Sequence, residues 1–369
     1  MTAATLRGAL QAIAAYGLGA HDQEVIRVDA EWRHLLLDGI TRERLSGLAI
    51  EASRSGLFDL SSAERDELLD RHDDQLGLDL VLERLLCEAA DVLDRAHIEY
   101  RALKGPVVAH TLYSDPALRS FGDVDLLVSG CDFDQAICVL GSLGFRRRFV
   151  EPRRGFDARF SKGSCLLGAA GQEIDLHRTF APGPYGTRLA TLDLLARPAQ
   201  HFRLGWREIP GVDRELGFVH ACFHAALGDF PPRLVPLRDV AEFLATGFDA
   251  DAVIRLVTNV RCATVLQRAL HLVEEELGIR VGGVLGEWSR RHVPSRFDRW
   301  ALGTYASRNR SYGAQAAVSV WVMPSLRDRV AFASALALPS RDYVRSRERN
   351  YGARIRHSVK LATTWRPPR

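Results

Sequence analysis

The chain has 369 residues, of which 47% are hydrophobic and 26% are charged, and its net charge is +3. This is the composition of a globular protein with enough apolar material for one large domain or two to three smaller ones. The small net charge argues against a general polyanion-binding protein. No run approaches the ~18 apolar residues needed to cross a bilayer, so we expect no membrane partner. The six cysteines show no metal-ligand spacing, and we expect buried free thiols in a cytoplasmic protein.

The first 95 residues are predicted to be helical. Apolar residues recur at three- and four-residue spacing from Trp32 to Leu48 and from Ala63 to Asp94. Ser61 is a suitable helix cap for the second segment, because Glu64 follows three residues later and completes a capping box.

A short strand and a sharp turn follow. Ile98 to Leu103 is predicted to be a strand, and Val107 to Tyr113 a helix. Gly105 permits the sharp exit from the strand, and Pro106 suits the first helical position. Lys104 lies at this turn, in a chain whose 49 basic residues include only three lysines. A compact ammonium at this place suggests a contact with phosphate.

Two acidic residues then begin an apolar strand. Asp123 and Asp125 start the run from 123 to 128, and side chains two apart in a strand point to the same face. Two carboxylates this close are costly unless a cation lies between them. Carboxylate oxygens together with substrate phosphates are typical ligands of Mg²⁺. The segment therefore predicts a metal–triphosphate site.

The rest of the mixed region, up to residue 210, is predicted to contain one helix and four strands before a loop-rich stretch. The helix is Cys131 to Gly144, the strands are Phe145 to Val150, Phe156 to Phe160, Ser164 to Leu167 and Glu173 to Leu176, and the loops cover 181–210. Arginines at 146–148 and 153–154 form a basic cluster, which is either a solvated sheet edge or a binding surface.

Helices return after residue 213 and lead to a basic tail. They are predicted at Glu215 to Leu227, Pro236 to Thr246, Ala250 to Asn259 and Ala263 to Glu276. The tail, 341–369, has nine basic and two acidic residues. It is either a packed structural helix or a surface that contacts nucleic acid or peptide.

The segment around the two acids resembles a known family. Leu103-Lys104-Gly105, then a helix, then Arg119-x-Phe121-Gly122-Asp123-x-Asp125, is similar to the polymerase-β-type nucleotidyltransferases. It most resembles an uncharacterised bacterial branch often found beside peptide-modification gene clusters. The usual turn of the superfamily is Gly-Ser or Gly-Gly, and here it is Lys104-Gly105.

This resemblance implies an α+β fold, in which a small mixed sheet at 96–210 lies between helical regions at 1–95 and 211–369. It implies transfer of a nucleoside monophosphate from an NTP to an unknown acceptor, with Mg²⁺ or Mn²⁺ as cofactor. Phosphate or pyrophosphate transfer is a nearby alternative. The acceptor could be a peptide, a small molecule or, for a toxin-like enzyme, tRNA or protein. The oligomeric state is left open.

The resemblance also suggests site residues. Asp175 matches the third carboxylate, so the implied catalytic and metal-binding set is Asp123, Asp125 and Asp175. The implied nucleotide and acceptor contacts are Lys104, Gly105, Arg119, Gly122, His177, His224 and Arg238.

Each of the weaker assignments has a structural alternative. Arg119 could brace the loop before Asp123 through a salt bridge, and His177 could be a satisfied structural histidine. Arg238 could form a simple pair within its helix. His220 and His224 are one helical turn apart, but no third zinc ligand is evident. A non-catalytic nucleotide- or peptide-binding protein is the rival interpretation, although such a protein has no need of three metal-ligating acids.

Overall fold

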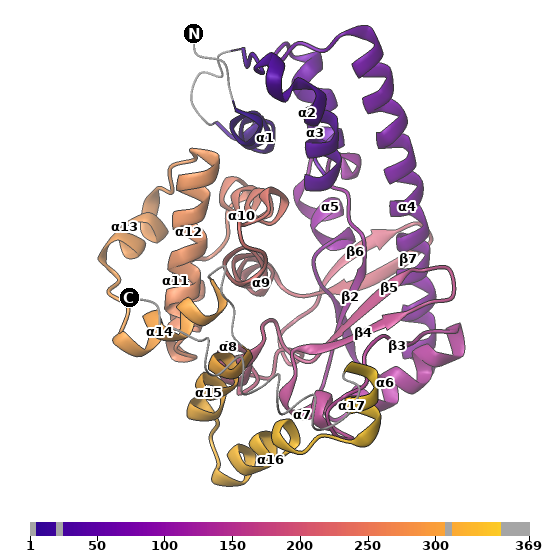
Figure 1. Cartoon of the computed structure of the whole chain (residues 1–369), viewed down its shortest axis with the longest axis vertical. Coiled ribbons are helices and arrows are strands. Elements are labelled where there is room, and N and C mark those ends of the chain that lie inside the picture. The colour runs from indigo at the N-terminus through magenta and orange to yellow at the C-terminus, as the bar shows by residue number, and fades with distance from the viewer. Residues whose placement is uncertain (1–4, 20–24, 307–311, 348–369) are drawn as a thin grey trace.

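A computed structural model describes residues 5–19, 25–306 and 312–347 (Figure 1). One seven-stranded mixed sheet lies between helices that precede and follow it in the chain. The α+β architecture predicted from the sequence is therefore confirmed. Within the described residues, no helix is long and apolar enough to span a membrane.

Four helices form the N-terminal region. They are α1 (Leu6–Ala15), α2 (Ala30–Glu43), α3 (Ser46–Arg54) and α4 (Ser62–Arg95). The predicted capping box is present, because Ser61 accepts a hydrogen bond from the Glu64 backbone and Glu64 reaches back to Ser61. The prediction of one helix from Trp32 to Leu48 is wrong. The chain breaks at Arg44, which adopts the left-handed conformation with φ of 57°.

The sheet has the strand order β3-β4-β5-β2-β1-β7-β6. The strands β2 and β5 run parallel, and β1 pairs with β2 antiparallel and with β7 parallel. The other neighbours are antiparallel. Bounds are β1 (Tyr100–Ala102), β2 (Val124–Val128), β3 (Arg146–Arg147), β4 (Gly163–Leu167), β5 (Glu173–His177), β6 (Gln200–Leu204) and β7 (Arg207–Gly211).

Short helices connect these strands. They are α5 (Pro106–Leu112), η1 (Pro116–Leu118), α6 (Phe133–Leu140), η2 (Gly141–Leu143), α7 (Phe156–Phe160) and α8 (Gly183–Leu189). The prediction of a strand at 156–160 is wrong. Phe156 and Phe160 are four residues apart, and as a helix both rings can pack against Phe332. The predicted loop at 181–210 also contains α8 and the β6–β7 hairpin, which turns at Gly205 with φ of 56°.

The C-terminal region is helical. Its elements are α9 (Arg214–Leu227), α10 (Leu234–Thr246), α11 (Ala250–Asn259), α12 (Ala263–Leu277), α13 (Gly283–Arg291), α14 (Arg296–Tyr305), α15 (Tyr312–Val322), α16 (Leu326–Ala337) and α17 (Arg341–Arg347). The first four agree with the predicted segments. Most of the predicted basic tail, 348–369, lies outside the described residues.

The two faces of the sheet belong to different hydrophobic cores. Val124, Leu126 and Val128 of β2 pack in one core with α4 and α6. The alternate residue Leu127 belongs to the other core, which also contains helices α1, α9, α10 and α12. Because residues two apart share a face, Asp125 points towards this second, helical side. The two terminal regions meet there, since α1 packs on α10 and α12.

The six cysteines are unpaired, as predicted, but their burial is mixed. Cys87, Cys222 and Cys262 are buried, whereas Cys131 and Cys138 on and before α6 are exposed. The expectation that the thiols are buried is therefore wrong for these two.

Candidate active site

Two carboxylates meet where β2 and β5 run side by side. Asp125 and Asp175 are direct partners in the parallel register of these strands. The neighbours Ile174 and Leu176 belong to the core on the opposite face, so Asp175 and Asp125 project to the same helical side. Asp175 is half-buried, and its carboxylate makes no hydrogen bond within the described residues. The strand register thus brings together two acids that are 50 residues apart in the chain.

Lys104 lies between the two acids of the Gly-Asp-x-Asp segment. Its Nζ is 3.2 Å from Oδ2 of Asp123 and 2.8 Å from Oδ2 of Asp125. Burial favours the neutral amine, but the charges of Asp125 and Asp123 outweigh it and raise the pKa of Lys104. The ammonium is therefore the cation that relieves the repulsion between these carboxylates.

His177 supports Asp125 from the next strand. Its Nε2 is 2.8 Å from Oδ1 of Asp125, and both side chains are fully buried. Burial, followed by the charge of Lys162, lowers the pKa of His177, so the ring is neutral near pH 7. A neutral ring facing a carboxylate donates its Nε2–H, which leaves Nδ1 unprotonated. That Nδ1 atom is buried without a hydrogen-bond partner in the described structure.

The two acids of the segment differ in their ionisation. Burial opposes the charge on Asp125, but Lys104 and the His177 hydrogen bond hold the pKa of Asp125 well below its ordinary value. The pKa of Asp123 is raised, first by the neighbouring charge of Asp125 and then by burial. Asp125 is therefore the firmly ionised member of the pair.

These side chains form a donor set that fits a divalent cation. One ligand atom each from Asp125, Asp175 and His177 lie within 4.8 Å of one another. Oδ2 of Asp125 is buried and makes no hydrogen bond, only the ion pair with Lys104. Carboxylate oxygens suit Mg²⁺ and Mn²⁺. A histidine that binds a metal commonly donates its other ring N–H to a carboxylate, as His177 does to Asp125. Asp125 and Asp175 of the predicted set therefore belong to this group together with His177, whereas Asp123 meets Asp125 through Lys104.

The two glycines of the motif are required for different reasons. Gly105 has φ of 53°, a conformation that favours glycine, and it begins the turn into α5. Gly122 has ordinary φ, but a Cβ there would overlap Nη2 of Arg44 and lie 2.7 Å from its Cζ. Gly122 therefore leaves room for a guanidinium that comes from the end of α2.

Arg119 has the structural role that was the alternative to phosphate binding. Its Nε and Nη2 donate to the two carboxylate oxygens of Asp239, each at 2.7 Å, and both side chains are buried. Nη1 donates to the carbonyl oxygen of Ser120. The hydroxyl of Tyr113 also donates to Asp239, at 2.9 Å. This network fixes the loop before Asp123 to α10.

Arg238 does not face the cleft, contrary to the sequence prediction. Its guanidinium pairs with Glu242 and donates to the carbonyl oxygens of Ala14 and Tyr16. These contacts fasten the end of α1 to α10. Neighbouring positions on a helix point about 100° apart, so Asp239 can face the active-site loop while Arg238 faces α1.

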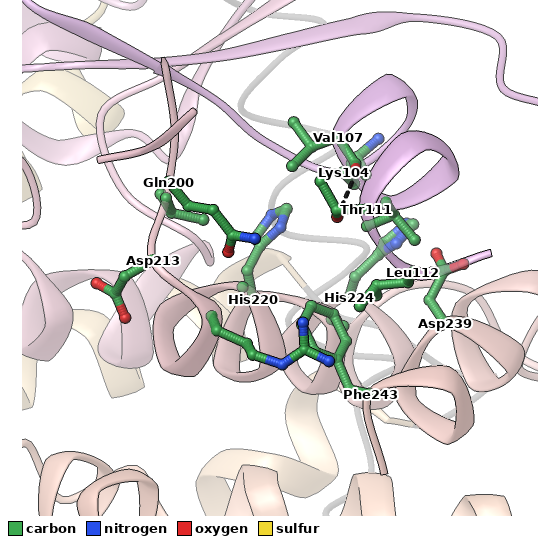
Figure 2. A pocket seen from close by; sticks show the side chains of 15 residues that line it. Lys104, Val107, Thr111, Leu112, Gln200, Asp213, His220, His224, Asp239 and Phe243 are labelled. Carbon is green, nitrogen blue, oxygen red and sulfur yellow. Dashed lines mark hydrogen bonds between the residues drawn. The ribbon is translucent and has the colours of Figure 1, made fainter. Parts of the chain in front are cut away.

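His224 lies at the site together with His220. Figure 2 shows both rings projecting from α9 towards Lys104 and α5, where they line a cavity of about 20 Å³. Burial lowers the pKa of both histidines well below the ordinary value, so both rings are neutral. The cavity has room for about one water molecule and is too small for a nucleobase. His224 also lines the larger cleft beside it.

The larger cleft has a volume of about 200 Å³. Its lining includes Gly105, Gly122 and Asp123 beside the sheet, and Arg44 and Arg233 from the flanking helical regions. The cleft therefore opens where the sheet, the end of α2 and the start of α10 meet.

Sequence reasoning missed Arg44, Arg233 and Lys162 as site residues. Lys162 precedes β4, and burial lowers its pKa although Asp125 and Asp175 oppose the effect. The rarity of lysine was a usable signal for Lys162. Nothing comparable marks Arg44 or Arg233, because arginine is abundant throughout the chain.

Comparison with known proteins gives two findings. A family of uncharacterised nucleotidyltransferases matches residues 29–278 of the chain. Among solved structures, an antigenic nucleotidyltransferase-like protein from Paracoccidioides brasiliensis is similar over 57% of this chain and 95% of its own, with 15% identity and a TM-score of 0.33. That likeness is too weak to place the site. The comparison with curated proteins finds no match.

Proposed function

Since the chain belongs to a family of uncharacterised nucleotidyltransferases, we propose that it transfers a nucleoside monophosphate from an NTP to an acceptor bound in the cleft beside Asp123. The observation that carries this proposal is the pairing of Asp125 with Asp175 across parallel strands, next to Asp123 and Lys104. A pure binding protein has no need of three converging carboxylates, because each raises the cost of holding an anionic ligand.

The proposed reaction is a single displacement at the α-phosphorus. An acceptor oxygen forms the new bond to this phosphorus, the bond to the oxygen bridging the α- and β-phosphates breaks, and pyrophosphate leaves. Mg²⁺ or Mn²⁺ held by Asp123, Asp125 and Asp175 would neutralise phosphate charge and acidify the acceptor hydroxyl.

Asp175 is the residue best placed to accept the proton of the acceptor. Oδ1 of Asp125 is occupied by His177, and its Oδ2 faces Lys104. Asp175 is less buried than Asp125, and its carboxylate makes no hydrogen bond within the described residues. It therefore keeps a free oxygen for proton transfer.

Lys104 and Gly105 would receive the triphosphate. Both line the cleft, and the ammonium can donate to a phosphate oxygen from its position beside Asp123. His224 lines the same cleft as a neutral ring, which can donate to or accept from an acceptor group. The acceptor classes that we propose to test are a peptide, a small molecule and tRNA.

The test uses the full chain, Mg²⁺, and ATP labelled separately at the α- and γ-phosphate, with each acceptor class in turn. We expect the α-label on the acceptor and the γ-label in pyrophosphate. Asp123→Asn, Asp125→Asn and Asp175→Asn should each abolish transfer. Asp251→Asn, which changes an exposed aspartate on α11, is the matched control and should transfer at the wild-type rate.

Each other outcome has a defined meaning. The γ-label on the acceptor would replace nucleotidyl transfer by phosphoryl transfer, and both labels together would indicate pyrophosphoryl transfer. ATP that binds with Mg²⁺ but is never turned over with any acceptor would favour the rival interpretation of a binding protein. Full activity in the three aspartate variants would refute the metal assignment.

A further inference from the structure

Four cationic side chains line the 200 Å³ cleft, and only two of them are neutralised by acids. Lys104 is paired with Asp123 and Asp125, and Arg119 is paired with Asp239. Arg44 and Arg233 form no ion pair within the part of the chain that the structure describes. The cleft lining therefore retains two guanidinium groups without an ion pair among the described residues.

Arg44 is held in the cleft by backbone and packing rather than by a partner for its charge. Its backbone N–H donates to the carbonyl oxygens of Ile40 and Thr41 and so ends α2. Its side chain is half-buried, and among the described residues the guanidinium makes no hydrogen bond. A left-handed conformation is unusual for a residue other than glycine or asparagine, and it costs on the order of 1 kcal/mol. A strained residue with an unused charge in a cleft is a candidate for ligand binding.

Arg233 is positioned by a junction between the two helical regions. Its Nη2 donates to the carbonyl oxygen of Arg42, and Glu43 accepts the backbone N–H of Leu234 at 3.0 Å. These two bonds join the end of α2 to the start of α10. Arg44 is the next residue after this junction, and both guanidinium groups line the same cleft, close enough for the charge of Arg233 to act on Arg44.

Among the described residues, the acids that line the cleft form no ion pair with these two arginines. Asp123 is paired with Lys104, and Glu173 is paired with Arg148. Asp229 is exposed and forms no ion pair within the described residues. Burial, followed by the charge of Arg233, lowers the pKa of Arg44, although the charge of Asp123 opposes the effect. Two like charges held this way are stabilised when an anion binds between them.

We propose that Arg44 and Arg233 form the subsite for the terminal phosphates of the nucleoside triphosphate, an assignment that rests on the proposed function. Guanidinium groups form two parallel hydrogen bonds with phosphate oxygens, which makes arginine suited to this task. The cleft of about 200 Å³ is smaller than the roughly 300–1,000 Å³ of typical small-molecule pockets, so we assign it the terminal phosphates and not the whole nucleotide.

Gly122 is part of this subsite although it offers no side chain. A Cβ at this position would overlap Nη2 of Arg44 and displace the guanidinium from the cleft. The small residue before Asp123 therefore serves a contact with α2, some 80 residues earlier in the chain. This juxtaposition allows two independent substitutions to remove the same contact.

The test is isothermal titration of the full chain with pyrophosphate, ATP and AMP, each with Mg²⁺. Arg44→Gly removes the guanidinium and suits the left-handed backbone, so the fold should hold. We expect it to weaken pyrophosphate and ATP binding about 10- to 100-fold and to change AMP binding less than about twofold. Arg233→Ala should act in the same direction. Arg255→Ala, which removes an exposed arginine on α11 outside the cleft, is the charge-matched control and should bind as wild type.

Gly122→Ala extends this test to the contact between Gly122 and the guanidinium of Arg44. Alone, it should reproduce the selective loss of pyrophosphate and ATP affinity. Combined with Arg44→Gly, it should add little, because both substitutions remove one contact. Independent, additive losses would refute the role assigned to Gly122.

The outcomes separate this subsite from the proposed function. Arg44→Gly and Arg233→Ala proteins that bind like Arg255→Ala, or that lose AMP affinity as strongly as ATP affinity, would overturn the subsite. So would a wild-type chain that binds neither pyrophosphate nor ATP. A wild-type chain that binds pyrophosphate through these arginines but transfers nothing from ATP would retain the subsite and refute the nucleotidyl transfer.

Discussion

Asp79 is a buried carboxyl that supports the active-site loop from α4. Its Oδ1 accepts the backbone N–H of Phe121 and Nε2 of Gln75, each at 3.0 Å. Burial raises the pKa of Asp79 to about 6, against 3.8 for an ordinary aspartate, and the hydrogen bonds only partly offset it. The loop that carries Gly122 and Asp123 is therefore held by the Asp79 carboxyl, whose pKa of about 6 is close to neutral pH.

The sign of the pH dependence follows from the direction of this shift. A carboxyl with a raised pKa favours folding while it is protonated, and this contribution is lost as the pH rises from about 4 through about 6. A pKa raised from 3.8 to about 6 corresponds to about 3 kcal/mol of folding free energy between the two limits. Asp79→Asn keeps an acceptor oxygen for Phe121 and cannot ionise. At pH 7.5 we therefore expect the variant to be more stable than wild type by up to about 3 kcal/mol.

Urea unfolding of both proteins at pH 5 and pH 7.5 measures this effect. The stability advantage of Asp79→Asn should grow by about 1.5 kcal/mol between these pH values, because wild-type Asp79 ionises over that range. Asp74→Asn, at an exposed position of the same helix, is the control and should change stability by less than about 0.5 kcal/mol. A difference between Asp79→Asn and wild type that is the same at both pH values would refute the reasoning.

Three further predictions concern the charges at the site. Lys104→Met should destabilise the metal-free protein by about 3–5 kcal/mol, because it leaves two carboxylates uncompensated. Mg²⁺ should then raise the unfolding temperature of this variant more than that of wild type. Equal increases in unfolding temperature would contradict this prediction. Asp123→Asn should keep or raise the stability of the metal-free protein, because the raised pKa of Asp123 reflects repulsion by Asp125 and burial. Asp125→Asn should lower this stability, because it removes the charged partner of Lys104 and His177. Equal changes in the unfolding temperature of the two variants would contradict this distinction. Arg119→Ala should cost about 3–5 kcal/mol, and the double variant with Asp239→Ala should recover part of it; an unchanged unfolding temperature would point to ligand binding instead.

The sheet that carries the carboxylates could be predicted because its signals are local. The apolar run after Asp123 fixes a strand, and the period of two fixes the face of Asp125. The pairing of Asp125 with Asp175 followed from the family resemblance, and the structure places the two residues directly opposite each other. Most of the chemical groups of the site therefore lie in two short segments of the sequence.

Local signals were ambiguous where one pattern fits two periods. Phe156, Ala158 and Phe160 alternate as in a strand, but the two phenylalanines are also one helical turn apart. The packing of Phe332 from α16 against both rings decides for the helix. The break at Arg44 had no signal at all, because no glycine or proline marks it.

The roles of the arginines could not be predicted because their partners are far away in the chain. Arg119 meets Asp239 across 120 residues, and Arg238 meets the carbonyl of Ala14 across 224. A motif can identify a cation near an acidic strand, but it cannot tell whether the protein itself neutralises that cation. The role of Arg44 could not be predicted for the same reason, because its contact with Gly122 depends on how α2 packs against the sheet.

The scarcity of lysine gains a physical meaning at the carboxylate cluster. Two of the three lysines, Lys104 and Lys162, exert their charge on Asp125 and Asp175, while the arginines line the outer cleft or lock the helices. An ammonium is compact and fits between Asp123 and Asp125 at 3.2 and 2.8 Å, whereas a planar guanidinium with five donors is wider. A small cation can stand between carboxylates that also have to accept a metal ion. The larger, forked guanidinium groups of Arg44 and Arg233 line the cleft instead, where they can bind phosphate oxygens through paired hydrogen bonds.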